Sequence, residues 1–83
     1  MSSIKKKLDR FLKNPKSSKY ADIARILNYF GFEKIEAKGS HVKFKHISLP
    51  NDLIIPIHNN ECKDFYKMEA RKIVKALNKI NHE

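Results

Sequence analysis

The stretch GFEKIEAKGSHVKFKHI, residues 31–47, decides the fold, because within it the spacing of apolar residues changes from that of a helix to that of a strand. Residues 32–37 predict a short strand, and Lys38 and Gly39 supply the residue types of a tight turn. Residues 40–47 predict a second strand that returns beside the first. The stretch is therefore typical of a β-hairpin.

The second strand of this hairpin has two unlike faces. Val42 and Phe44 fall on one side, since successive side chains of a strand point in opposite directions. The other side carries His41, Lys43 and Lys45. We therefore expect the apolar side to pack in a core and the basic side to face solvent or a charged ligand.

A helix is predicted on either side of the sheet-forming residues. Residues 20–30 place an apolar stripe on one helical face, and Gly31 suits a left-handed C-terminal cap. Residues 53–58 predict a third strand, in which Pro56 favours an edge position or a bulge because proline cannot donate to a ladder. Residues 59–67 read as a loop, and residues 68–80 predict the last helix.

The N-terminal residues 2–14 predict a short, basic amphipathic helix. Pro15 ends it, because a helix rarely continues into the residue before proline. We therefore divide the chain into a basic N-terminal helix with its linker, residues 1–19, and a domain, residues 20–83.

These elements place the chain in the α+β class. A three-stranded antiparallel sheet with one bare apolar face is not stable alone, so the helices should cover that face. The expected architecture is a small two-layer sandwich with the helices on one face of the sheet, in the outline of a double-stranded-RNA-binding domain. The face with His41, Lys43 and Lys45 would then remain in solvent.

The chain is small and strongly basic. Its 83 residues carry a formal net charge of +9, which favours polyanionic partners such as RNA because neutralised phosphates release counterions. A single cysteine, Cys62, excludes an internal disulfide framework and fits a reducing cytoplasm. Since no apolar run approaches the roughly 20 residues that cross a membrane, we expect no membrane partner.

Three runs of the sequence, taken in order, resemble the HicA toxins of bacterial toxin–antitoxin systems. They are ADIARILNYFGFEKIEAKGSHVKFKH (residues 21–46), LIIPIH (53–58) and KDFYKMEARKIVKAL (63–77). The matching features are a helix ending in Gly-Phe, a Gly-Ser-His in the hairpin, a Pro-x-His in the next strand and a basic last helix with an arginine. The resemblance implies the double-stranded-RNA-binding-domain fold, an mRNA interferase activity, a HicB-type antitoxin partner and a place in the bacterial cytoplasm.

The resemblance places His41 at the catalytic position of the family. Imidazole suits acid–base chemistry because both of its protonation states exist near neutral pH. In metal-independent RNA cleavage the nucleophile is the 2′-hydroxyl of the RNA itself, which attacks the neighbouring phosphate. No cofactor is therefore expected. The expected RNA-binding residues are Lys38, Gly39, Ser40, Lys43, Lys45 and His58. The lysines would hold phosphate, Gly39 would allow close approach of the backbone, and Ser40 would donate a hydrogen bond. His58 is the histidine of the Pro-x-His motif.

Other interpretations of the same residues stay open. The chain also fits a non-catalytic RNA-binding module of this fold, or a protein-interaction domain whose basic N-terminal helix docks an acidic partner. His41 also fits an ordinary exposed hairpin histidine, and His46, an odd number of residues away, is expected to pack or cap on the opposite face. The histidines lack the spacing of metal ligands with a carboxylate beside them, so no metal site is expected.

Overall fold

The computed structural model describes residues 2–36 and 39–81, which form three α-helices, a short 3-10 helix and a three-stranded sheet. Along the chain the elements are α1 (Ser2–Lys13), η1 (Pro15–Ser17), α2 (Tyr20–Tyr29), β1 (Glu33–Glu36), β2 (His41–Lys45), β3 (Leu53–Pro56) and α3 (Asp64–Asn81). The α+β class and the order of helices and strands expected from the sequence are therefore confirmed.

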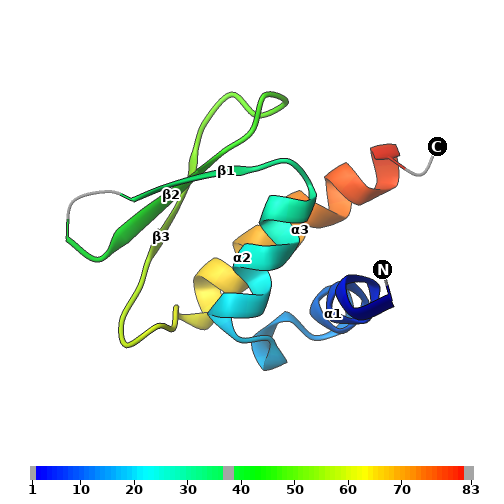
Figure 1. Ribbon diagram of the computed structural model, residues 1–83, viewed down its shortest axis with the longest axis horizontal. Coiled ribbons are helices and arrows are strands. Elements are labelled where there is room, and N and C mark those ends of the chain that lie inside the picture. Colours follow the sequence, from blue (N-terminus) through cyan, green and yellow to red (C-terminus); the bar gives the residue numbers. More distant parts are fainter. Residues whose placement is uncertain (1, 37–38, 82–83) are drawn as a thin grey trace.

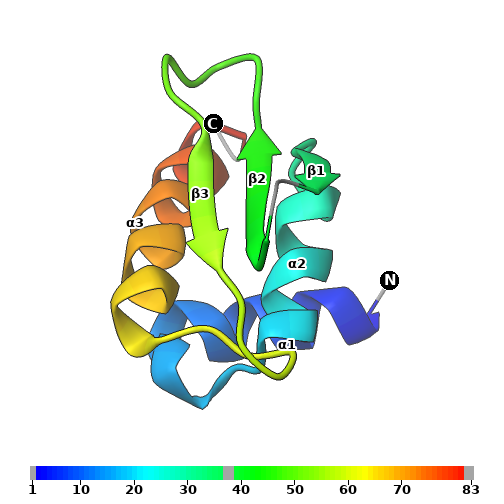
Figure 2. The same cartoon turned by 90° about the vertical axis from the view of Figure 1, so that its left-hand side faces the viewer.

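The sheet and the helices form separate layers (Figure 1). Helices α2 and α3 cover one face of the sheet, and α1 lies on the side of these two helices that points away from the sheet. Figure 2, turned to look onto the sheet, shows the strands in front of the helices. This is the expected outline of a double-stranded-RNA-binding domain, with α1 added behind its helix layer.

The sheet is antiparallel, with β2 between β1 and β3. Phe44 of β2 lies opposite Lys34 of β1 and Leu53 of β3. Pro56 ends β3 at an edge of the sheet, as its missing N–H group predicts. Because β2 is paired on both sides, the side chains on its outer face have fixed positions along the strand.

One hydrophobic core lies between the layers. Val42 and Phe44 of β2 are 7% and 1% exposed, which confirms that this face of the hairpin packs inward. The largest fully buried side chains are Phe11, Ile23, Ile26, Leu27, Phe44, Ile55 and Val74. Every α-helix and two of the strands contribute to this set, so the core continues from the sheet through α2 and α3 to α1.

Helix α2 ends in a Schellman motif at the residue that the sequence indicated. Gly31 has a φ of 93°, in the left-handed region, and its N–H donates to the Asn28 carbonyl at 3.0 Å. The N–H of Phe32 donates to the Leu27 carbonyl, also at 3.0 Å, and the side chains of both residues are buried. This turn sends the chain directly from α2 into β1.

The start of α3 differs from the prediction. The helix begins at Asp64, so residues 64–67, which the sequence analysis assigned to a loop, form its first turn. Asp64 places a negative charge at the positive end of the helix dipole. Lys67 in the same turn is buried, and its Nζ lies 3.4 Å from the carboxylate of Glu61. These polar contacts stabilise a turn that apolar spacing alone does not reveal.

Candidate active site on the outer face of the sheet

Strand β2 alternates as the sequence predicts. Val42 and Phe44 are buried, whereas His41 and Lys45 are exposed and Lys43 is half-buried. The outward residues therefore form one row on the face of the sheet that the helices leave open. The structure places the candidate catalytic histidine at the start of this row.

The neighbouring strands surround the first part of this row with uncharged residues. His41 lies opposite Pro56 of β3, and Lys43 lies between Ile35 of β1 and Ile54 of β3. The side chain of Ile54 remains 46% exposed. Since no acidic residue occupies these paired positions, the positive charge of Lys43 is available to an anionic ligand.

Lys45 occupies a different environment at the far end of β2. It lies opposite Glu33 of β1, a residue of opposite charge. Cross-strand pairs of this kind attract each other, so the carboxylate competes with any phosphate for the lysine. The positive charge of Lys45 is therefore less available to an anionic ligand than that of Lys43.

Gly39 and Ser40 lie just before β2. Gly39 has a φ of 71°, a left-handed conformation that favours glycine, and Ser40 is exposed. The carbonyl of Ser40 accepts a hydrogen bond of 2.6 Å from the N–H of Ile57, which extends the pairing of β2 with β3 by one residue. Lys38, the remaining predicted RNA-binding residue of the hairpin, lies outside the described residues.

His58 reaches the same end of the sheet. It lies two residues after Pro56, the strand partner of His41, and it lines a second cavity together with Pro56 and with Glu61, Cys62, Lys63 and Tyr66. His58 and Glu61 exchange backbone hydrogen bonds of 2.7 and 2.9 Å across a two-residue turn. Both turn residues, Asn59 and Asn60, have positive φ, as a type I′ turn requires. The tight turn fixes the backbone of His58 close to the hairpin.

His46 has a structural role. Its Nε2 lies 2.9 Å from the Phe30 carbonyl, and its Nδ1 accepts a hydrogen bond of 3.0 Å from the Ser48 N–H. The ring also packs on Phe32, with 4.7 Å between centroids. Because Nδ1 accepts, the proton lies on Nε2 and donates to Phe30. The prediction that this histidine packs and caps is confirmed.

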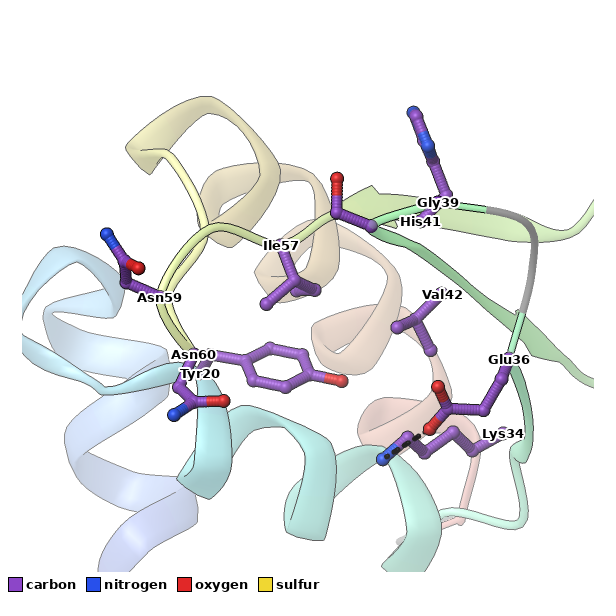
Figure 3. Close-up of a pocket in the computed structure, with 10 residues that line it drawn as sticks. Tyr20, Lys34, Glu36, Gly39, His41, Val42, Ile57, Asn59 and Asn60 are labelled. Atoms are coloured by element: carbon purple, nitrogen blue, oxygen red, sulfur yellow. Dashed lines mark ion pairs between the residues drawn. The ribbon is translucent and has the colours of Figure 1, made fainter.

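A cavity of about 330 Å³ lies beneath the same end of the hairpin (Figure 3). Its walls come from the first residue of α2, from β1, from the start of β2 and from the connection between β3 and α3. Val42, Ile57 and the ring of Tyr20 form apolar walls, and Glu36 and Asn60 supply polar groups. The side chain of His41 points away from this cavity, although the residue lines its rim.

The hydroxyl of Tyr20 points into the cavity, toward Val42 and Glu36 (Figure 3). Tyr20 is 9% exposed, and its hydroxyl has no hydrogen-bond partner within residues 2–36 and 39–81. Burial raises the pKa of this phenol above its usual value, and the nearby charges of Glu36 and Cys62 raise it further. The group therefore stays protonated near neutral pH and can donate a hydrogen bond.

A family comparison gives the same family as the sequence resemblance. Residues 20–69 match the model of the HicA toxin of bacterial toxin–antitoxin systems, which covers the chain from α2 into α3. The chain belongs to the HicA toxin family. No curated protein and no solved structure matches it.

Membership of the HicA family makes the protein a toxin of a toxin–antitoxin system, and such a system includes an antitoxin partner. The matched region contains the whole candidate site, including His41 and His58. Helix α1 lies before the match, so the family model accounts for the sheet and its two covering helices but not for this added helix.

Within residues 2–36 and 39–81, no three histidine, cysteine or acidic side chains gather as metal ligands, and no helix is long and apolar enough to span a bilayer. Burial raises the pKa of Cys62, an effect that Lys67 partly offsets and that Glu61 and Asp64 reinforce. The thiol of this free cysteine is therefore mostly protonated and weakly reactive at neutral pH.

The cavity and the residues that position it were not predicted from the sequence. Tyr20 was assigned only to the apolar stripe of a helix, and its hydroxyl was not considered. Its backbone N–H donates to the carboxylate of Glu61 at 3.3 Å, and Lys67 holds that carboxylate from α3. A tyrosine at the first turn of a helix, where a phenylalanine would pack equally well, was the available signal.

Proposed function

We propose that this HicA-family toxin is an endoribonuclease that cleaves mRNA without a metal, with His41 as its catalytic residue. The observation that carries the proposal is the exposure of His41 in one row with Lys43, on the face of the sheet that the helices leave open. An imidazole beside an ammonium group supplies both a proton-transfer group and a phosphate ligand. The family match supports the toxin role.

The reaction is an internal transesterification of RNA. The 2′-oxygen attacks the adjacent phosphorus and the bond from phosphorus to the 5′-oxygen breaks, which leaves a 2′,3′-cyclic phosphate and a free 5′-hydroxyl. One proton leaves the 2′-hydroxyl and one is delivered to the leaving oxygen. His41 performs one of these transfers, and His58, two residues after the Pro56 that pairs with His41, is the candidate for the other.

Lys43 stabilises the reacting phosphate in this account. Successive outward residues of a strand are roughly 6.7 Å apart, so the flexible lysine side chain can reach a phosphate held at His41. Its ammonium group offsets the charge that develops on the non-bridging oxygens. The amide or hydroxyl of Ser40, just before His41, adds a further donor, whereas Lys45 acts mainly as a distant phosphate contact.

The partner that silences this activity is, in our proposal, a HicB-type antitoxin in the bacterial cytoplasm. An inhibitor of this reaction has to cover His41 and compete with phosphate for Lys43. An acidic segment laid over the outer face of β2 would do both, because the sheet exposes these residues together.

The experiment that tests the proposal is RNA cleavage by purified protein in EDTA, with binding of the same RNA measured in parallel. The wild type should cut the RNA, and His41→Ala should bind it with similar affinity without cutting. Binding without cleavage by either protein would leave an RNA-binding module, and salt-sensitive binding to an acidic protein with none to RNA would leave a protein-interaction domain. Either result would overturn the nuclease proposal.

A further inference from the structure

The cavity beneath the hairpin points to a second component of the site. We propose that it is a base-binding subsite, which takes one unpaired guanine of the RNA next to the bond that is cut. The inference deepens the proposed nuclease function and rests on it for its biological meaning. Binding of the base itself can be measured without any cleavage.

The dimensions and walls of the cavity suit a single base. Its volume of about 330 Å³ lies at the lower end of the roughly 300–1,000 Å³ range of ligand pockets. The ring of Tyr20 and the side chains of Val42 and Ile57 provide apolar surface for a flat aromatic group. Proteins commonly recognise unpaired RNA bases by such stacking surfaces combined with a few hydrogen-bonding groups.

The unused hydroxyl of Tyr20 is the strongest sign of a ligand. A buried polar group without a partner destabilises the fold, and a phenylalanine would fill the same space without that cost. The group remains unsatisfied within the described ranges, yet it is aimed into a cavity that opens at the surface. A hydrogen-bond acceptor on a bound base would satisfy it.

Glu36 supplies the complementary group. Its carboxylate lines the cavity and its side chain is 80% exposed, with Lys34 at 3.7 Å as a weak ion-pair partner. Guanine offers N1–H and N2–H side by side, which fit the two oxygens of a carboxylate, and its O6 lies next to them. Tyr20 would donate a hydrogen bond to O6, and Glu36 would accept from N1–H and N2–H. All three hydrogen-bonding groups on the Watson–Crick edge of guanine would then have a partner.

The subsite lies next to the proposed catalytic group. Gly39, Ser40 and His41 all line the rim, while the His41 side chain points to the other side of the strand. A nucleotide whose phosphate rests at His41 can therefore turn its base over the hairpin backbone into the cavity. Asn60, held by the type I′ turn, borders the opposite side. Only an unpaired base can make this turn, because a paired base remains in its helix.

The test is an NMR titration of isotope-labelled protein with each of the four nucleoside 5′-monophosphates, for the wild type, Tyr20→Phe and Tyr29→Phe. Tyr29 is a matched control because it lies in the same helix, is 62% exposed and does not line the cavity. We expect GMP to shift the signals of Tyr20, Ile57 and Asn60 most strongly. Tyr20→Phe should weaken GMP binding about 3- to 10-fold, as loss of one hydrogen bond predicts, and Tyr29→Phe should not.

The inference is overturned if no nucleotide shifts the cavity signals, or if Tyr20→Phe binds GMP as well as the wild type. These outcomes do not test the nuclease proposal, because a mononucleotide contains no internucleotide bond to cut. RNA cleavage with unchanged GMP binding in Tyr20→Phe would remove the subsite alone. GMP binding in the cavity without RNA cleavage would remove the nuclease alone.

Discussion

The Nε–H of Arg71 in α3 donates a hydrogen bond of 2.6 Å to the backbone carbonyl of Leu12, in the last turn of α1. That carbonyl is one of the four at the end of a helix that have no partner within the helix. The arginine therefore satisfies a backbone group and places a positive charge at the negative end of the helix dipole. This contact joins the added N-terminal helix to the rest of the fold through α3, which also covers the sheet.

Replacing Arg71 by alanine should lower the free energy of unfolding. A hydrogen bond from a charged group contributes about 1.5–3 kcal/mol, and the half-buried position suggests a loss near 1–2 kcal/mol. Urea unfolding measures the change. Arg25→Ala, an exposed arginine of α2, is the control and should stay within about 0.5 kcal/mol of the wild type. Equal stabilities of the two variants would show that the contact to Leu12 contributes nothing.

Phe11→Ala tests how strongly residues 1–19 depend on residues 20–83. Phe11 is 0% exposed in the common core, so its truncation should cost about 3–5 kcal/mol. The tyrosines all lie beyond residue 19, and their fluorescence should therefore report an unfolding transition shifted to lower urea. Ile47→Ala, at a fully exposed loop position, should leave it unchanged. A tyrosine transition that Phe11→Ala does not move would mean that α1 folds separately.

His46→Ala should destabilise the protein without removing the proposed catalytic group. The change leaves the Phe30 carbonyl and the Ser48 N–H without their side-chain partner and removes a ring packed on Phe32. The expected loss is about 1–3 kcal/mol, visible in thermal unfolding. Below the transition, the folded variant should cut RNA at nearly the wild-type rate. A large loss of cleavage in a fully folded His46→Ala protein would contradict the structural role.

Tyr20→Phe should make the protein more stable. The substitution removes a buried hydroxyl that is unsatisfied within the described ranges and keeps the ring that packs in the core. A gain of about 1 kcal/mol is expected, which raises the Tm of a domain of this size by roughly 4–8 °C. Tyr29→Phe, at an exposed ring, should not change Tm. A lower Tm for Tyr20→Phe would show that the hydroxyl has a partner in solution.

The fold was largely predictable because its main signals are local. The alternation of Val42 and Phe44 with polar residues defines the inward face of β2, and Gly31 marks the end of α2. The first turn of α3 was missed because it depends on polar contacts between distant residues. Lys67 is buried through Glu61 and the carbonyl of Lys16, and such contacts leave no apolar period in the sequence.

The candidate site was predictable in part for the same reason. Neighbours along one strand, such as His41 and Lys43, share a face whenever the strand forms. The cavity combines Tyr20 with Glu36 and Asn60 from three separate segments. Only the packed arrangement of helix, hairpin and turn brings these groups together, so no local pattern indicated it.

The single-turnover rate of RNA cleavage in EDTA, measured for the wild type, His41→Ala and His58→Ala at saturating protein, tests the central claim most directly. Loss of a general acid or base typically costs about 10²–10⁴-fold, and the account predicts a fall of that size for His41→Ala with a smaller one for His58→Ala. RNA affinity should remain close to that of the wild type in both variants. A His41→Ala protein that binds RNA and cuts it at the wild-type rate would contradict the account.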